Sequence, residues 1–103
     1  MTDLTDQNFD ELVGSNGTAV VEFGGEFCGP CHHVRGQLEC IERNCIGVRF
    51  GFVDVQDNVR VASRFSISSI PVVMVFKDGR VQSCIRGRSK NWGERVISAI
   101  QAG

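Results

Sequence analysis

Phe-Cys-Gly-Pro-Cys, residues 27–31, is the stretch that constrains the fold of this 103-residue sequence most. An apolar run typical of a buried strand, residues 18–23, precedes it, and apolar residues follow at helical spacing from residue 30 to about residue 45. The cysteine pair therefore lies where a strand passes into a helix. Free N–H groups and the positive end of the helix dipole favour a thiolate at Cys28, and Cys31 lies one turn away, where it can close a disulfide.

Outward from this motif the chain alternates between short apolar runs and amphipathic stretches. A Lys-Asp-Gly turn, residues 77–79, joins two of the runs and predicts a hairpin. The predicted order is a weak strand (1–4), a helix ending before the turn at 14–17, a strand (18–23), a helix (30–45), a strand (48–55), a short helix (59–65), a hairpin (71–76 and 80–86) and a last helix after residue 89. This order predicts an α/β fold, a mixed sheet with helices on both faces. Because no repeat or linker interrupts the sequence, we expect one domain, residues 1–103.

The same pattern predicts caps and core positions. Thr5 or Asp6 is suited to cap the first helix, and Ser89 is suited to cap the last one. The residues expected to face the core are Phe9, Leu12 and Val13 in the first helix, Val59, Ala62 and Phe65 in the short helix, and Val96, Ile97 and Ile100 in the last.

Charge and composition exclude several classes of protein. Eleven basic and twelve acidic residues give a net charge of -1, without a run of like charge, which argues against nucleic-acid binding. No apolar stretch has the roughly 20 residues that span a bilayer, and the first residues lack the pattern of a secretory signal. We therefore expect a cytoplasmic protein without a membrane partner; we also expect a monomer.

The five cysteines divide into one pair and three single residues. Helical spacing places Cys45 on the apolar stripe that follows the motif and Cys40 on the opposite side of the helix. Cys84 falls on the last predicted strand, and the sequence does not say on which face. Each of these three is interpreted as a small apolar thiol without a catalytic role, with a regulatory disulfide as the alternative.

The sequence resembles thioredoxins over essentially its whole length. Three stretches carry the resemblance: the Cys-Gly-Pro-Cys motif after Phe27, Ile70-Pro71 before an apolar strand that ends in Phe-Lys-Asp-Gly at 76–79, and Gly87 eight residues after that glycine. The resemblance implies a thioredoxin fold, with a mixed five-stranded sheet whose first strand is short and four flanking helices. It also implies a small disulfide reductase, and thioredoxins are a known example of a reactive Cys-x-x-Cys thiol.

The resemblance further implies a role for individual residues. Cys28 would attack a substrate disulfide, Cys31 would resolve the mixed disulfide, and Glu22 would accept and donate the proton. The Ile70–Pro71 bond would be cis, next to the cysteines. The substrate chain would dock on Phe27, Gly29, Pro30, Ile70, Pro71 and Gly87. No cofactor beyond the redox-active disulfide is implied; the implied partners are disulfide-containing proteins and an electron donor of the thioredoxin-reductase type.

The chain departs from the family pattern at several positions. Phe27 and Gly24-Gly25 stand where thioredoxins usually have tryptophan and a Trp-Ala pair, Gly36 replaces a mid-helix proline, and His32 replaces a lysine. A family aspartate corresponds to Glu22, and the lysine that pairs with it corresponds to Phe52. Because Glu22 has valine and phenylalanine neighbours and lacks that lysine, we expect its pKa to be raised and its charge to be uncompensated.

Other functions fit parts of the motif. A thiol oxidant or isomerase on the same fold would differ only in redox potential. A non-enzymatic docking module is a further alternative. A metal site formed by the cysteine pair with His32, His33, Cys40 or Cys45 would have suitable ligand types, but the helical spacing keeps Cys40 and Cys45 from converging on the pair. Cys-x-x-Cys-His also matches the covalent haem signature, although a chain filled with core elements leaves little space for haem.

Overall fold

The structure, a computed structural model, describes residues 1–102. In chain order its elements are β1 (Thr2–Leu4), α1 (Phe9–Val13), β2 (Thr18–Gly24), α2 (Gly29–Arg43), β3 (Arg49–Asp54), α3 (Val59–Arg64), β4 (Val72–Lys77), β5 (Arg80–Arg86) and α4 (Trp92–Gln101). Their type and order agree with the sequence pattern. None of the helices within the described residues has the length and apolar content needed to cross a membrane.

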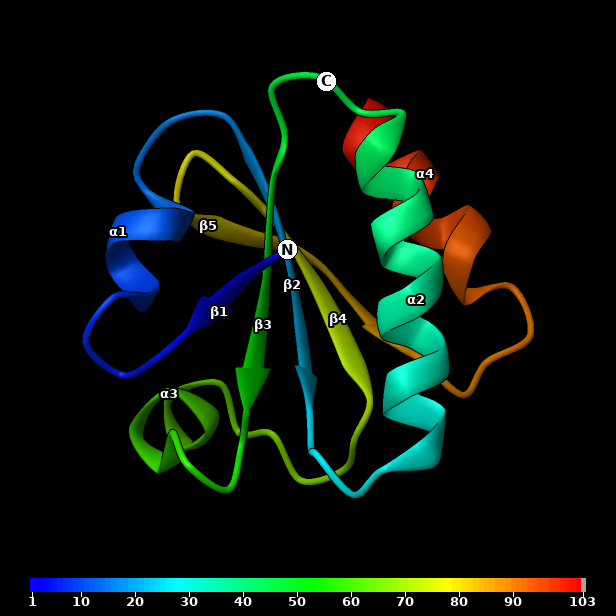
Figure 1. Cartoon of the computed structure of the whole chain (residues 1–103). Coiled ribbons are helices and arrows are strands. Elements are labelled where there is room, and N and C mark those ends of the chain that lie inside the picture. Colours follow the sequence, from blue (N-terminus) through cyan, green and yellow to red (C-terminus); the bar gives the residue numbers. More distant parts are fainter. Residues whose placement is uncertain (103) are drawn as a thin grey trace.

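The sheet is mixed, with the strand order β1-β3-β2-β4-β5 (Figure 1). β1, β3 and β2 run parallel, whereas β4 is antiparallel to both β2 and β5. Asp78 and Gly79 join β4 to β5 with φ angles of 52° and 82°, the left-handed backbone that a tight hairpin turn requires. β2 lies at the centre of the sheet, which explains why its sequence is a continuous apolar run broken only by Glu22.

Helices cover both faces of the sheet and create two cores. Figure 1 shows α1 and α3 on one face and α2 and α4 on the other. The first core includes Phe9, Val21 and Phe23, and the second includes Val20, Leu38 and Val96. Successive residues of β2 thus point to opposite cores, as the pleat of a strand requires.

Of the predicted caps, Thr5 makes the hydrogen bonds of an N-cap on the turn that leads into α1, whereas the predictions for Asp6 and Ser89 are wrong because their side chains bond elsewhere. Thr5 accepts hydrogen bonds from the N–H groups of the turn before α1, which begins only at Phe9. Asp6 Oδ1 instead accepts from the N–H of Val61, 2.9 Å away in the first turn of α3. Ser89 donates its hydroxyl to the carbonyl of Arg86, and α4 begins three residues after Ser89.

Two of the predicted core positions are also wrong. Val59 is 63% exposed, and Ile97 is 41% exposed. Val59 is the first residue of the short helix α3, and the side chains that reach the core from this helix are Val61 and Ala62. Ile97 follows the buried Val96 by one residue, a rotation of about 100° that turns its side chain away from the sheet.

Candidate active site

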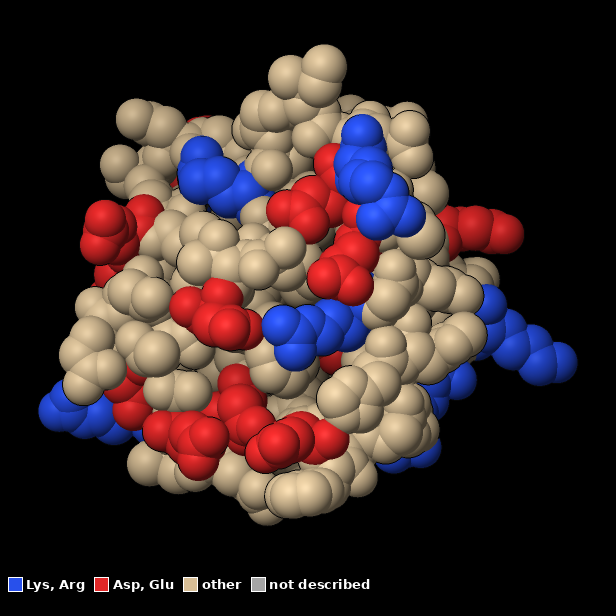
Figure 2. Space-filling model, in the orientation of Figure 1, with Lys and Arg blue, Asp and Glu red and all other residues tan. Residues whose placement is uncertain are grey.

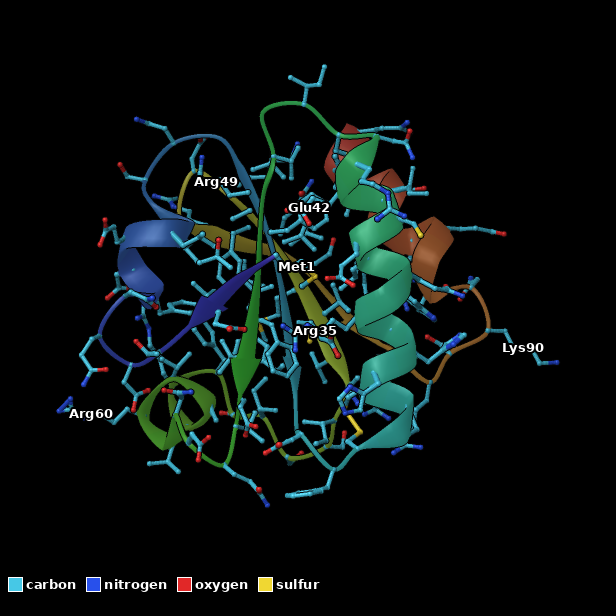
Figure 3. All side chains as sticks on the ribbon, viewed as in Figure 1. Met1, Arg35, Glu42, Arg49, Arg60 and Lys90 are labelled. Carbon is cyan, nitrogen blue, oxygen red and sulfur yellow. A yellow bond between two sulfur atoms is a disulfide. The ribbon has the colours of Figure 1, made fainter. Side chains whose placement is uncertain are left out.

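The two cysteines of the motif lie at the junction between β2 and α2 and are joined by a disulfide. Their Cα atoms are 5.2 Å apart, and Figure 3 shows the bond at the first turn of α2. Cys28 is the N-cap residue of this helix, and its Sγ accepts a hydrogen bond from the N–H of Cys31 at 3.2 Å. Cys31 is buried, whereas Cys28 is partly exposed. The sulfur of Cys28 is therefore the one that a large substrate can reach.

Segments far apart in the sequence meet around this disulfide. The Ile70–Pro71 peptide bond is cis. A Cβ placed on Gly25 would lie 3.3 Å from Cδ1 of Ile70 and 3.9 Å from Cβ of Cys28, which puts Ile70 beside the motif. The N–H of Gly87 donates to the carbonyl of Pro71 at 2.9 Å.

The surface around the pair is apolar and accessible. Phe27 is 90% exposed, and Gly29 and Pro30 are exposed as well. The carbonyl of Ile70 accepts a hydrogen bond from Nε of Arg88 at 3.3 Å. The residues that the resemblance assigns to docking thus divide into three exposed residues beside Cys28 (Phe27, Gly29 and Pro30), the half-buried Ile70, and two buried supporting residues, Pro71 and Gly87.

Glu22 lies deeper in the protein than the disulfide, on the central strand β2 of the sheet. It is fully buried, on the face that α2 covers, and its register partners are Phe52 in β3 and Val73 in β4. Neither of its carboxylate oxygens has a hydrogen-bond partner among residues 1–102. A buried polar group without a partner is rare and costly, which marks this carboxyl group as a candidate functional group.

Gly24 lies close to both Glu22 and Cys31. A Cβ at this position would lie 3.0 Å from Cβ of Cys31, 3.0 Å from the Phe52 ring and 3.1 Å from Oε2 of Glu22. The carboxylate, the ring and the buried cysteine therefore border one small space. The missing side chain at Gly24 leaves that space open.

Burial raises the pKa of Glu22 from 4.5 to about 8, which agrees with the expectation of a raised value. The positive charge of Arg35 lowers the pKa and opposes this effect, whereas Glu39 adds a smaller upward contribution. The charge of Glu22 is therefore partly offset by Arg35, although no side chain among the described residues pairs with the carboxylate directly, and this corrects the expectation of a wholly uncompensated charge. The sequence signal for this was the spacing of Cys31 and Arg35, four residues apart and hence on one face of α2.

The remaining cysteines and histidines do not join the pair in a metal site. Within the described part of the chain, no three histidine, cysteine, aspartate or glutamate side chains form a group that could hold a metal ion. Nε2 of His32 lies 2.5 Å from the carbonyl oxygen of Glu26, so this nitrogen carries the proton. Cys40 is exposed and accepts from Arg43 at 3.1 Å, Cys45 packs against the α2–α4 core while half-buried, and Cys84 is exposed on β5.

A hollow of about 430 Å³ lies beside the site. Its lining includes Glu26, His32, Arg35, Phe52 and Asp57. Figure 2 shows acidic side chains gathered over the end of the sheet near α3, with the basic side chains of this face standing apart from one another. Arg35 and the Phe52 ring thus border this solvent-accessible hollow.

Comparison with known proteins agrees with this geometry. The family profile described as "Thioredoxin" matches residues 1–101. A thioredoxin from Chlamydia trachomatis is 34% identical over 99 residues, which cover 95% of this chain and 96% of that protein. One from Staphylococcus haemolyticus is 39% identical over 77 residues, which cover 74% of this chain and 73% of that protein. A solved structure of Plasmodium falciparum thioredoxin has a TM-score of 0.86 and 25% identity, with 95% of this chain and 97% of that chain covered.

Proposed function

The chain belongs to the thioredoxin family, and from this premise we propose that it is a protein-disulfide reductase with Cys28 as nucleophile and Cys31 as resolving thiol. Membership makes it a dithiol/disulfide oxidoreductase, an enzyme rather than a docking module, with Cys28 and Cys31 as its redox-active pair. One observation carries the assignment of roles: the first sulfur is partly exposed at the start of α2, and the second is buried beside a carboxyl group.

The first step is attack on a substrate disulfide. The thiolate of Cys28 forms a bond to one substrate sulfur, the substrate S–S bond breaks, and the other substrate sulfur leaves as a thiolate that takes up a proton. The N–H of Cys31, which donates to Sγ of Cys28, supports negative charge on this sulfur. The product is a mixed disulfide between Cys28 and the substrate.

The second step releases the substrate. The thiol of Cys31 gives its proton to the Glu22 carboxylate, and its sulfur attacks Sγ of Cys28. The Cys28–Cys31 bond forms, and the remaining substrate cysteine leaves and receives the proton from Glu22. The balance is one substrate disulfide reduced to two thiols and one protein dithiol oxidised to a disulfide.

The docking surface is proposed to be the apolar residues beside Cys28, three of them exposed and Ile70 half-buried. Phe27, Gly29, Pro30 and Ile70 would contact the substrate chain, while Pro71 and Gly87 would fix the position of Ile70. An extended substrate segment can pair with the backbone of Ile70, as in strand addition to an exposed edge. Arg88, which now bonds the Ile70 carbonyl, must then give up that acceptor.

The partners follow from the reaction. Thioredoxins act on protein disulfides and are reduced by thioredoxin reductase, and we extend both roles to this chain, with residues 1–103 acting as one domain. No cofactor beyond the Cys28–Cys31 disulfide enters the steps above. The cytoplasm, where thiols are kept reduced and disulfides are transient, is the compartment that suits a reductant.

Insulin reduction and thiol mapping test the proposal. The protein should reduce insulin disulfides with a thiol donor, and Cys28→Ser should abolish the activity. Cys31→Ser should accumulate mixed disulfides through Cys28, and Cys28 should be alkylated before Cys31, Cys40 or Cys84 in the reduced protein. A redox potential near the roughly -270 mV of thioredoxins supports a reductant; a value near -120 mV would indicate an oxidant on the same fold.

A further inference from the structure

Arg35 is fixed in place at two points. Its guanidinium carbon lies 4.4 Å from the centroid of the Phe52 ring, and Nη2 donates to Oδ1 of Asp3 at 3.2 Å. Figure 3 shows Arg35 between α2 and the parallel strands of the sheet. Stacking on an aromatic ring and a bond to a carboxylate together hold a planar guanidinium in one orientation.

The Phe52 ring, on which Arg35 stacks, also lies near the buried carboxylate of Glu22. Phe52 is the register partner of Glu22 in the parallel pair β2–β3, so their side chains are neighbours on the α2 face. Both approach the open space at Gly24, where a Cβ would lie 3.0 Å from the ring and 3.1 Å from Oε2 of Glu22. The guanidinium of Arg35 thus stacks on an aromatic ring that borders the same small space as the Glu22 carboxylate.

Two charged groups of α2 act on the Glu22 carboxyl group, and a carboxylate of β1 binds one of them. From α2, Arg35 and Glu39 act on the carboxyl group with opposite sign. From β1, Asp3 binds Arg35 and is largely exposed, with 82% of its side chain accessible. The register partners from β3 and β4, Phe52 and Val73, carry no charge. Within residues 1–102, Arg35 is therefore the cation that favours the ionised form of this carboxyl group.

We propose that Arg35 is a positioning residue for the second exchange step, supplying from α2 the positive charge that stabilises the Glu22 carboxylate as it accepts the Cys31 proton. This role rests on the proposed function, in which Glu22 is the proton acceptor. It also explains how the chain can have Phe52 at the position of the family lysine. The phenylalanine ring stacks with Arg35, and this residue of the neighbouring helix supplies the positive charge.

Arg35→Gln tests this role, with Arg43→Gln as the matched control. Arg43 is exposed near the end of the same helix, so its replacement removes an equal charge far from the buried carboxyl group. By carbon-13 NMR of the oxidised protein, Arg35→Gln should raise the pKa of Glu22 by about one pH unit. The rate of the Cys31 step near pH 7 should fall by up to about tenfold and recover at higher pH. Arg43→Gln should change neither quantity.

Arg35→Lys separates charge from packing. Lysine keeps the positive charge but loses the planar stack. Arg35→Lys should therefore reverse most of the increase in the Glu22 pKa seen in Arg35→Gln and retain at least half of the wild-type rate. An unchanged Glu22 pKa in Arg35→Gln, or an Arg35→Lys variant that behaves like Arg35→Gln, overturns the role of Arg35.

Failure of the proposed function gives a different result. If Glu22→Gln exchanges disulfides at the wild-type rate, Glu22 is not the proton acceptor, and the roles of both Glu22 and Arg35 fall together. If Glu22→Gln is slow while Arg35→Gln leaves the Glu22 pKa and the rate unchanged, only the role of Arg35 falls.

Discussion

At Glu22 a carboxyl group occupies a position of β2 whose neighbours from Ala19 to Phe23 are all apolar and buried. Because the folded-state pKa of about 8 exceeds the value of 4.5 for an exposed glutamate, the folded protein holds the proton more tightly than the unfolded chain. Stability must then fall as the pH rises through this interval, by about 1.4 kcal/mol per pH unit. Between pH 4.5 and pH 7 the loss is about 3 kcal/mol.

Replacement of Glu22 by leucine should remove this loss and slow catalysis at the same time. We expect Glu22→Leu to stabilise the oxidised protein at pH 7 by up to about 3 kcal/mol and to flatten the pH dependence of unfolding between about pH 4.5 and pH 8. The same variant should prolong the mixed disulfide, because Cys31 loses its proton acceptor. Urea unfolding at several pH values and trapping of the mixed disulfide measure the two effects.

Glu39→Gln is the control for this experiment, since Glu39 is an exposed acid that contributes only a small part of the Glu22 environment. It should leave both the pH profile and the exchange rate close to those of the wild type. Parallel stability profiles for wild type and Glu22→Leu would show that Glu22 ionises as an ordinary carboxyl group in the folded protein.

Among the elements, α2 positions both the reactive cysteines and Arg35. It begins with Cys28 as N-cap, and Pro30 stands in its first turn, where its missing N–H costs nothing. Val34 and Leu38 anchor the helix to the sheet, and Ile41 continues the same stripe. Its solvent side is less well suited to a helix, because Gly36 stands in the interior, where glycine loses the most backbone freedom on folding.

Gly36→Ala should stabilise the protein without changing its reaction. A Cβ at Gly36 would meet no atom within 4 Å, so the added methyl group fits without any rearrangement. The expected gain is about 0.5–1 kcal/mol, read as a higher midpoint in urea with an unchanged slope. Insulin reduction should match that of the wild type. A lower midpoint, or a slower reaction, would mean that this turn of α2 has to deform during the cycle.

The strand-to-helix junction and the hairpin are predictable from sequence because local signals encode them. Apolar periodicity identifies β2 and α2, and the Asp-Gly turn identifies the β4–β5 connection. Asp6 and Arg35 are different. Asp6 caps a helix residue 55 positions away, and Arg35 binds a carboxylate 32 positions away.

Such partners depend on which elements the sheet brings together, and no periodicity contains that information. For Glu22 the sequence contained only part of the signal: helical spacing places Arg35 on the same face of α2 as Cys31, but it does not say which strand that face covers. The buried position of Glu22 follows from the apolar run around it, but the cation that acts on it comes from a helix packed above the strand. From the sequence alone, Phe52 indicates the loss of a charge, whereas in the structure a cation from another element, Arg35 of α2, lies over this ring.

At the scale of the whole molecule, the site depends on three segments that meet at one end of the sheet. The motif at the start of α2, the Ile70–Pro71 bond before β4 and the loop after β5 belong to different parts of the chain. Gly87 is the contact between them: a Cβ there would lie 2.7 Å from Cγ of Pro71 and 3.0 Å from Cγ2 of Val34. Only a residue without a side chain fits between α2 and this proline.

Gly87→Ala should therefore weaken both the fold and the reaction. The N–H of Gly87 bonds the Pro71 carbonyl at 2.9 Å, so the backbone cannot retreat from the clash without losing that hydrogen bond. Overpacking of this kind costs about 1–3 kcal/mol, and any shift of Pro71 also moves Ile70 relative to Cys28. We expect a lower urea midpoint and slower insulin reduction under conditions where the variant remains folded.

Gly93→Ala is the matched control, because a Cβ at Gly93, in the first turn of α4, would meet no atom within 4 Å. That variant should be as active as the wild type and as stable or up to about 1 kcal/mol more stable. If Gly87→Ala proves equal to Gly93→Ala in both measurements, the loop after β5 yields freely, and Gly87 does not fix the position of Pro71.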